Sequence, residues 1–499
     1  MKFRLLSGAL LTALAGTAGA VSLNPQGIGQ VLLYPYFTVN ANNQTLVSVV
    51  NTQNAGKVAK VRFLEGYNGR EVLDFNLYLS PYDVWTATIF DTAGVNQRPN
   101  DDSVAAALLT PDSSCTDPAI KTGTAGLTEL LLDGRNFVAF SNHAYSAPAG
   151  DGGPTELSRT RTGHIELIEM ASVIGTTLTN IRHINGVPKN CGAIIGAQNS
   201  ADYSSPTGGL FGSASIVNTL AGTLYGYNAE ALNGFYTNAG NLFGAAGSPS
   251  PDLSSGDNGN ISPGNEVSYV FGEDGSLITS SWPLSNGGSI DAVSSIFTAD
   301  QIFNEFELNP IIGSVASEWM VTFPTKHYYA DATLSSPVQP FTHIFGSDST
   351  RPASACELMV VKIYDREERT PQSTGSIGVP TPLPLPTLCW ESQVIVILPA
   401  ALVSIFGSPI FGSPLMAIAD PFKYGSSFTS GTLAITLSGN GHALRTSNEG
   451  NAFAGLPVIG FLAKDFTNKN VTPGVLGNYA GLFRHHISQA CSNTSGSCH

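Results

Sequence analysis

Charged side chains are scarce in this sequence, because Asp, Glu, Lys and Arg together make up only 12% of its 499 residues. An average soluble domain carries about twice that share. Long helices usually place Glu, Lys, Ala and Leu on their exposed faces, so the shortage argues for strands and loops instead. Gly, Pro, Ser, Thr and Asn are abundant, and they predict a surface of hydroxyl, amide and backbone groups.

Basic residues are rarer than acidic ones, with 23 Lys and Arg against 37 Asp and Glu and a net charge of -14. Proteins that bind nucleic acid take much of their affinity from basic side chains that contact phosphates. We therefore expect no nucleic-acid partner.

The sequence also lacks the short motifs that mark common active sites and metal sites. It contains no G-x-S-x-G, no H-E-x-x-H, no Walker loop and no C-x-x-C. It therefore predicts no catalytic, cofactor-binding or metal-ligating residue, and no cofactor. Because catalytic triads are recognised by geometry rather than by spacing, an enzyme assembled from distant residues stays the alternative.

The first twenty residues follow the order of a secretory signal peptide. Lys2 and Arg4 precede an apolar run at 5–14, and Ala18-Gly19-Ala20 has the form of a cleavage site. We expect an exported protein that begins near Val21 and lies outside the cell or on its surface, with the periplasm as the alternative.

Six cysteines are present, an even number that predicts disulfides in an oxidising compartment. Fifteen pairings are possible. We favour the sequential one, because each bond then clips one local region. The candidates are Cys115 with Cys191, Cys356 with Cys389, and Cys491 with Cys498.

Short β-rich runs separated by turn residues dominate the first part of the chain. They lie at 45–50, 58–64, 72–79 and 84–89, and apolar and more polar residues alternate along the third run. This spacing predicts a mainly β protein with an immunoglobulin-like sandwich in its N-terminal region and further β-rich and loop-rich regions.

Composition divides the chain into six segments. They are a signal peptide at 1–20, an N-terminal β-sandwich region at 21–195, a Gly/Ser/Asn-rich, loop-rich region at 196–288 with strands at 213–217 and 223–227, a β region at 289–370, a Pro-rich linker at 371–388, and a C-terminal β region at 389–499.

Two segments carry specific structural expectations. The best helical pattern runs over 298–306, where Thr298 and Gln301 are placed to form a capping box. The segment 392–419 has no charged residue, but three prolines and two glycines interrupt it. It therefore predicts buried strands with turns, and we expect no transmembrane anchor.

Several phrases spread over most of the chain resemble a group of uncharacterised exported proteins of Gram-negative bacteria. The resemblance implies export and a bacterial origin, and it implies no catalytic residue. The phrases are LYPYFTV at 33–39, SVVNT at 48–52, VRFLEG at 61–66, LSPYDVW at 79–85, GHIE at 163–166, TFPTK at 322–326 and YDREE at 364–368.

Three clusters of polar residues have both a functional and a structural interpretation. His164 and Glu166 would share one face of a strand, where His143 would complete a metal site. A half-exposed strand surface explains the same residues. His485 and His486 would point to opposite faces of a strand, so they favour a tail closed by its disulfide over a metal site.

Acidic residues gather at 365–368. Asp365, Glu367 and Glu368 would serve as calcium ligands or as the acid and base of a glycoside hydrolase. Arg366 and Arg369 alternate with them, so we favour a solvated ion-pair cluster at the end of a strand.

Tyrosines stand in Gly- and Asn-rich surroundings, where exposed rings would form a platform for sugar stacking or protein binding. The alternative is filling at the edges of a sandwich. They are Tyr34, Tyr36, Tyr82, Tyr225, Tyr227, Tyr328 and Tyr329.

Together these observations favour a non-catalytic protein of the bacterial cell surface or extracellular matrix with a structural or adhesive role. Its partners would be surface or matrix components, a glycan, or further copies of the chain. The alternatives are a secreted hydrolase of polysaccharide or protein, and a carbohydrate-binding protein without turnover.

Overall fold

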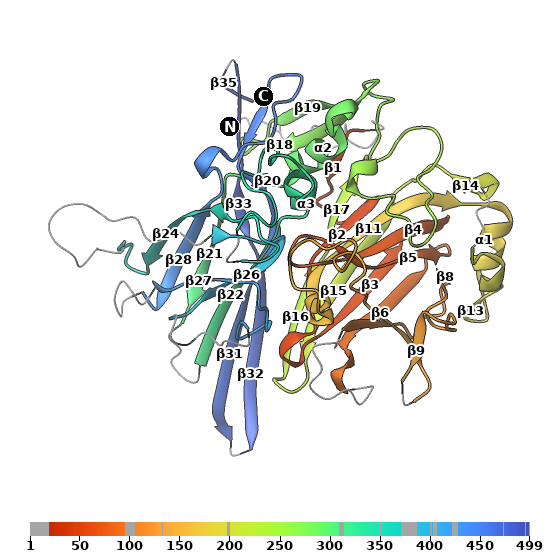
Figure 1. Cartoon of the computed structure of the whole chain (residues 1–499), viewed down its shortest axis with the longest axis horizontal. Coiled ribbons are helices and arrows are strands. Elements are labelled where there is room, and N and C mark those ends of the chain that lie inside the picture. The colour runs from red at the N-terminus through yellow and green to blue at the C-terminus, as the bar shows by residue number, and fades with distance from the viewer. Residues whose placement is uncertain are drawn as a thin grey trace, which may run out of the picture.

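A computed structural model describes residues 19–94, 105–131, 133–196, 200–308, 314–348, 351–370, 387–399, 402, 407–421, 428–472, 474–494 and 496–498. Two β-sandwiches lie side by side (Figure 1). The expected signal peptide falls outside the described residues except for its last two positions. The Pro-rich linker at 371–388 likewise falls outside them except for its last two positions.

The first sandwich consists of two antiparallel sheets. One sheet has the strand order β1 (Ser22–Leu23), β17 (Glu230–Asn233), β2 (Val31–Thr38), β11 (Thr162–Val173), β4 (Gly56–Glu65), β5 (Glu71–Leu79) and β8 (Thr116–Asp117), and β14 (Tyr203–Ser204) also pairs with β11. The other, called the seven-stranded sheet, has the order β16 (Thr223–Asn228), β15 (Leu210–Asn218), β3 (Gln44–Asn51), β6 (Val84–Asp91), β7 (Ala106–Leu109), β10 (Asn136–Ala139) and β9 (Thr128–Leu130).

The four expected N-terminal strands are present and divide between these sheets. β3 and β6 pair with each other in the seven-stranded sheet, while β4 and β5 pair in the opposite sheet. The chain therefore crosses twice between the layers, which confirms the predicted sandwich. The strands expected at 213–217 and 223–227 are β15 and β16, and they extend the seven-stranded sheet.

The second sandwich also has two sheets. The five-stranded sheet has the order β27 (Met416–Ala419), β26 (Ser392–Ile397), β22 (Ser314–Thr322), β31 (Ile459–Thr472) and β32 (Val475–Arg484). The four-stranded sheet has the order β24 (Val360–Asp365), β28 (Ser430–Thr436), β21 (Gln301–Glu307) and β33 (His486–Ser488).

Short strands and three α-helices complete the described part of the structure. The helices are α1 (Gly175–Ile181), α2 (Gly288–Phe297) and α3 (Lys326–Ala330). The small sheets pair β12 (His183–Ile184) with β13 (Val187–Pro188), β18 (Asn265–Phe271) with β19 (Leu277–Pro283), β20 (Thr298–Ala299) with β30 (Leu456–Pro457), β23 (Glu357–Leu358) with β25 (Thr387–Leu388), and β34 (Ala490–Asn493) with both β29 (Ala452–Ala454) and β35 (Gly496–Ser497). Among the described residues, no helix has the length and apolar character needed to cross a membrane.

The central strands β26 and β22 of the five-stranded sheet are covered on both faces. Trp319 on β22 belongs to the core of the second sandwich, whereas its neighbour Met320 belongs to a core shared with the first sandwich. Along β26, Ile395 and Val394 divide in the same way, and every residue of this strand is buried. Continuous burial is typical of strands covered on both sides, and it explains why the segment 392–419 carries no charge.

The helix expected at 298–306 is wrong. The helix α2 ends at Phe297, and the residues that follow form β20 and β21. Thr298 donates a hydrogen bond from its hydroxyl to the carbonyl of Ser294 at 2.8 Å, so it lies at the end of a helix rather than at the beginning of one. All ten residues of α2 are buried, and a helix without an exposed face has no polar stripe in its sequence.

Three disulfides join Cys115 to Cys191, Cys356 to Cys389 and Cys491 to Cys498. These are the sequential pairs that the sequence favours.

Candidate functional site

His164 and Glu166 lie on one face of β11, as expected, and both are fully buried. This face of the sheet meets α3 and the turn before β26, which bring His327 and Glu391 to it. We call His164, Glu166, Arg62, His327 and Glu391 the junction cluster, because its members come from both sandwiches. His143 lies instead on an exposed turn and bonds to none of them.

Short polar contacts connect the members of the cluster. His327 Nδ1 lies 2.5 Å from Glu391 Oε1, and His164 Nε2 lies 4.0 Å from the same oxygen. Arg62 donates from Nη1 to Glu166 Oε2 at 2.7 Å. The backbone N–H groups of Glu391 and Ser392 donate to the carbonyls of residues 67 and 66, both at 2.9 Å. The cluster therefore binds the two sandwiches together.

Burial controls the protonation of the cluster. Burial raises the pKa of Glu166 to about 7, even though Arg62 opposes the shift. Burial also pushes the pKa of His164 well below its usual value, and the nearby charges of His327 and Arg62 lower it further. Burial lowers the pKa of His327 too, but the carboxylate of Glu391 outweighs this effect and the net shift is upward. Burial thus favours the uncharged form of His164, and the adjacent carboxylate of Glu391 favours the protonated form of His327.

A serine completes an arrangement that resembles a catalytic triad. Ser392 Oγ lies 3.4 Å from His164 Nδ1, so serine, histidine and glutamate follow one another in space. A nucleophilic serine must meet its substrate. Ser392 is fully buried, however, and its hydroxyl bonds to Thr322 Oγ1 at 2.9 Å. The arrangement therefore stabilises the junction and offers no nucleophile to a substrate.

The turn that covers the cluster requires glycine. Gly69 has a φ of +70°, a conformation that glycine adopts far more readily than other residues. A Cβ atom at this position would lie 2.6 Å from Glu391 Oε2 and 2.7 Å from His327 Nδ1. Gly69 thus lets the backbone close over the ion pair. Within the described ranges, no three His, Cys, Asp or Glu residues are arranged to hold a metal ion.

The acidic residues at 365–368 form the ion-pair cluster that the sequence favours. Arg369 Nε lies 2.7 Å from Asp365 Oδ2, and its Nη2 lies 3.1 Å from Glu367 Oε2. One arginine therefore engages both carboxylates at the end of β24. Burial opposes ionisation of Asp365, but backbone hydrogen bonds from Arg369 and Glu367 and the charge of Arg369 lower its pKa. Asp365 is therefore poorly suited to be the protonated acid that a glycosidase needs.

The tyrosines mostly fill the cores, which favours the second of the two interpretations that the sequence leaves open. Tyr82 is 65% exposed, but five of the seven rings are buried and Tyr328 is partly buried. Two of the buried hydroxyls have hydrogen-bond acceptors inside: Tyr34 donates to the carbonyl of Ser48 at 2.8 Å, and Tyr329 donates to Asp291 Oδ1 at 2.9 Å. The buried ones are Tyr34, Tyr36, Tyr225, Tyr227 and Tyr329.

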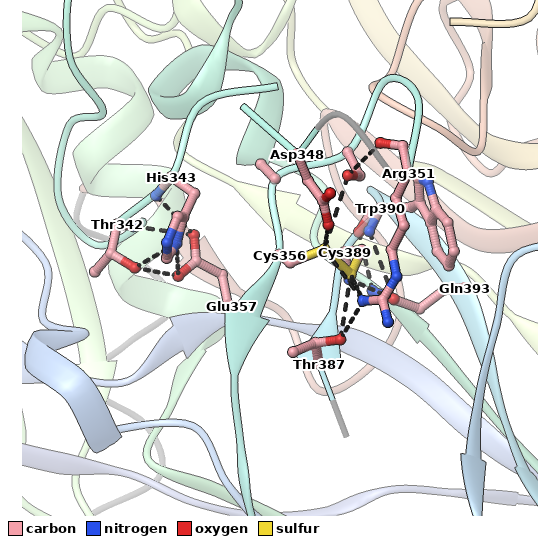
Figure 2. The surroundings of a disulfide bond; sticks show 12 residues. Thr342, His343, Asp348, Arg351, Cys356, Glu357, Thr387, Cys389, Trp390 and Gln393 are labelled. Carbon is pink, nitrogen blue, oxygen red and sulfur yellow. Dashed lines mark hydrogen bonds and ion pairs between the residues drawn. A yellow bond between two sulfur atoms is a disulfide. The ribbon is translucent and has the colours of Figure 1, made fainter. Parts of the chain in front are cut away.

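The disulfide of Cys356 and Cys389 has an arginine beside it. Figure 2 shows Arg351 reaching towards the two sulfur atoms, and its Nη1 donates to Thr387 Oγ1 at 2.6 Å and lies 3.0 Å from Cys389 Sγ. Glu357, next to Cys356, accepts a hydrogen bond from buried His442 at 2.9 Å. Burial opposes ionisation of Glu357, but the bond from His442 and the charge of Lys326 lower its pKa to about 2. The disulfide thus joins the two ends of the segment that contains the Pro-rich linker.

One face of the four neighbouring strands β16, β15, β3 and β6 is open to solvent, and its outward-pointing side chains carry no charge. Across β16, β15, β3 and β6, the side chains of Asn228, Ser213, Ser48 and Thr86 form one row of paired positions. A parallel apolar row flanks it. We call these two rows and their neighbours the open face: Phe211, Ser213, Ser215, Leu224, Asn228, Leu46, Ser48, Val50, Val84, Thr86 and Thr88.

The open face contains a hollow. The hollow measures about 360 Å³ and is lined by Leu46, Ser48, Thr86 and their neighbours. The hydroxyls of Ser48 and Ser213 lie 2.9 Å apart and hydrogen bond across the strands. Typical protein surfaces carry charged side chains on roughly a quarter to a third of their positions. A face that is formed by several strands and carries no charged side chain is therefore a candidate contact surface.

Sequence reasoning found part of these sites. It identified His164 and Glu166 but missed Arg62, His327 and Glu391, because no local motif connects residues that only the tertiary structure brings together. The open face had a signal in the low charge of the strands at 45–50 and 213–217. Comparison with known protein families, curated proteins and solved structures finds no match to this chain.

Proposed function

We propose that this chain is an exported, non-catalytic protein of the bacterial cell surface or extracellular matrix, and that it has a structural or adhesive role. The open face would be its contact surface. Export is supported by three disulfides, which persist in oxidising compartments.

The observation that carries the adhesive role is the absence of charged side chains from the open face of a chain with a net charge of -14. The centres of protein interfaces are depleted of charge, because a charge buried without a partner is costly. Hydroxyl and amide groups on the open face can replace their hydrogen bonds to water with hydrogen bonds to a partner. Burial of the flanking apolar side chains would stabilise the complex.

Neither alternative has equal support. A hydrolase needs an accessible acid and base, but the junction cluster is enclosed and the carboxylates of Asp365 and Glu367 share Arg369. Sugar binding without turnover usually involves exposed rings. Of the seven tyrosines that the sequence offered for such a platform, five are buried.

A pair of matched substitutions tests the proposal. Thr86→Lys places a charge in the open face, and Thr432→Lys places one on β28, the corresponding inner strand of the four-stranded sheet; both threonines are exposed. We expect purified Thr86→Lys protein to lose binding to isolated bacterial envelopes by at least tenfold, and Thr432→Lys protein to bind like the wild type. Equal binding by all three proteins would contradict the role of the open face.

Two further measurements separate the alternatives. A glycan array identifies a sugar ligand if Thr86→Lys abolishes a signal that the wild-type protein gives. Size-exclusion chromatography with light scattering shows whether the partner is a second copy.

A further inference from the structure

Two cavities adjoin each other where the sandwiches meet. The first measures about 280 Å³ and lies between the segment 23–27, β17 and the hairpin of β31 and β32. The second measures about 320 Å³ and lies beside α2, β21 and β33. Leu23, Glu230, Gly460 and Arg484 line both cavities, so these residues form the wall between them.

The second cavity is mainly apolar. Its lining combines residues from α2, β21, β31 and β33, and the buried ones belong to the core of the second sandwich. They would give an aliphatic chain continuous contact on several sides. The apolar side chains are Leu23, Ile296, Phe297, Ile302, Val458, Ile459 and Ile487.

Arg484 supplies the cation at the wall. Its side chain is 65% exposed and its Nη2 pairs with Glu230 Oε2. A guanidinium group has five N–H donors in a planar fork. Its Nε and Nη1 bond to no other described side chain, so they remain available to a ligand.

The cation and the anion at the wall are Arg484 and Glu230, and Glu230 is the one acidic residue among the described residues that line either cavity. Burial lowers the pKa of His485, which lines the second cavity, to about 4, so Arg484 is the group that an anionic ligand would contact. Burial raises the pKa of Glu230, although Arg484 partly offsets the shift. Glu230 therefore gives up negative charge more readily than an exposed carboxylate, and a ligand carboxylate can replace it beside Arg484.

We propose that these cavities form one binding site for a medium-chain aliphatic carboxylate. The carboxylate accepts hydrogen bonds from the guanidinium of Arg484, and the hydrocarbon chain occupies the apolar cavity beside Ile302 and Val458. Small-molecule sites combine a mainly apolar lining with a few convergent polar groups in this way. The cavity volumes lie at the lower end of the range for such sites, which suits a single unbranched chain. This site is separate from the open face and does not depend on the proposed adhesive role.

Isothermal titration calorimetry on the full mature chain with hexanoate, octanoate and decanoate, each kept below its micelle concentration, tests the site. We expect about fourfold tighter binding for each added methylene, the factor that corresponds to roughly 0.8 kcal/mol per buried CH₂. Decanol should bind at least tenfold more weakly than decanoate, because it lacks the charge that Arg484 recognises. Affinity independent of chain length, or tighter binding of decyltrimethylammonium than of decanoate, would overturn the proposal.

Three variants locate the site. Arg484→Gln should weaken decanoate binding by about tenfold or more and leave decanol binding unchanged. Arg369→Gln is the matched control, because it removes another exposed, ion-paired arginine, and it should bind decanoate like the wild type. Ile487→Asp places a carboxylate in the apolar lining at a position that is 47% exposed, so it should weaken decanoate binding without affecting the fold. Wild-type affinity in both Arg484→Gln and Ile487→Asp would contradict the assignment.

Discussion

The five-stranded sheet and the seven-stranded sheet differ in what covers them. In the former, the central strands β26 and β22 pack against protein on both faces, one against the core of the second sandwich and the other against the first sandwich. The seven-stranded sheet packs on one side and leaves the open face to solvent. Its strands consequently alternate between buried and exposed residues, whereas β26 is buried throughout. The comparison shows that two chemically similar uncharged segments can lie in opposite surroundings, one joining the sandwiches and one open to solvent.

The largest expected effect comes from a phenylalanine between the sandwiches. Phe411 is fully buried, and its ring lies 5.5 Å from that of Tyr36 and 6.0 Å from that of Phe461, measured between centroids. We expect Phe411→Ala to lower the free energy of unfolding by about 3–5 kcal/mol, because it leaves a cavity in the shared core.

The same substitution on the open face provides the control. Phe211 is 37% exposed, so Phe211→Ala should cost about 1 kcal/mol or less. Urea denaturation of the two variants checks the contrast. Similar losses in both variants would show that the shared core contributes no more than the surface does.

A smaller effect should appear as the pH changes. Glu318 accepts hydrogen bonds from the backbone N–H groups of Ile410 and Phe411 at 2.7 and 3.2 Å. Burial raises its pKa from 4.5 to about 7, although these bonds oppose the shift. Between these two values the folded state holds a proton that the unfolded chain has lost. The free energy of unfolding should therefore fall as the pH rises from 4.5 to 7, by roughly 3 kcal/mol for this group.

Replacing Glu318 with Gln should flatten this pH dependence. Glu166 keeps its own contribution in the same direction, so the slope decreases without disappearing. Glu367→Gln is the control, because the side chain of Glu367 is 61% exposed. Denaturation at pH 5 and pH 8 gives the slopes, and an unchanged slope in Glu318→Gln would assign the dependence to other groups.

The smallest of the three effects compares two glycines. Gly69→Ala adds a methyl group against Glu391 and His327 at a positive φ, whereas Gly134→Ala adds one at a φ of +83° with no atom within 4 Å. The strain of the backbone alone should cost about 1 kcal/mol in both. Gly69→Ala should cost a further 1–2 kcal/mol, because the ion pair must move. Thermal unfolding measures the difference in stability between the two variants. Equal losses of stability would show that the junction cluster accommodates the added methyl group at no measurable cost.

Sequence patterns predicted the strands that have one buried and one exposed face. They failed for a helix that is buried on all sides. β-rich composition and flanking turn residues identified β3 and β6, and the residues of both strands alternate between buried and exposed. The alternation expected along 72–79 is weaker in the structure, because the second half of β5 is buried on both sides. The helix α2 shows no contrast between two faces, since all ten of its residues are buried, and the nearest polar pattern, at 298–306, belongs to strands.

The candidate sites were predictable to the extent that their residues are neighbours in sequence. His164 and Glu166 stand two positions apart on one strand, so their shared face followed from strand geometry. His327 and Glu391 join them through a fold that places α3 and the turn before β26 over the first sandwich, and no local spacing contains that information. The disulfide pairs were also predictable from the sequence, because each bond joins a cysteine to the next one along the chain.

The five-stranded sheet contributes side chains to two hydrophobic cores, so the two sandwiches depend on each other for stability. If the chain were cut between the sandwiches, Tyr36 and Tyr227 would face water on one fragment and Met320 and Phe461 on the other. Neither half is then an autonomous unit, and each fragment would aggregate through its newly bared patch. The chain should melt in a single cooperative step, and it can be engineered only as one piece.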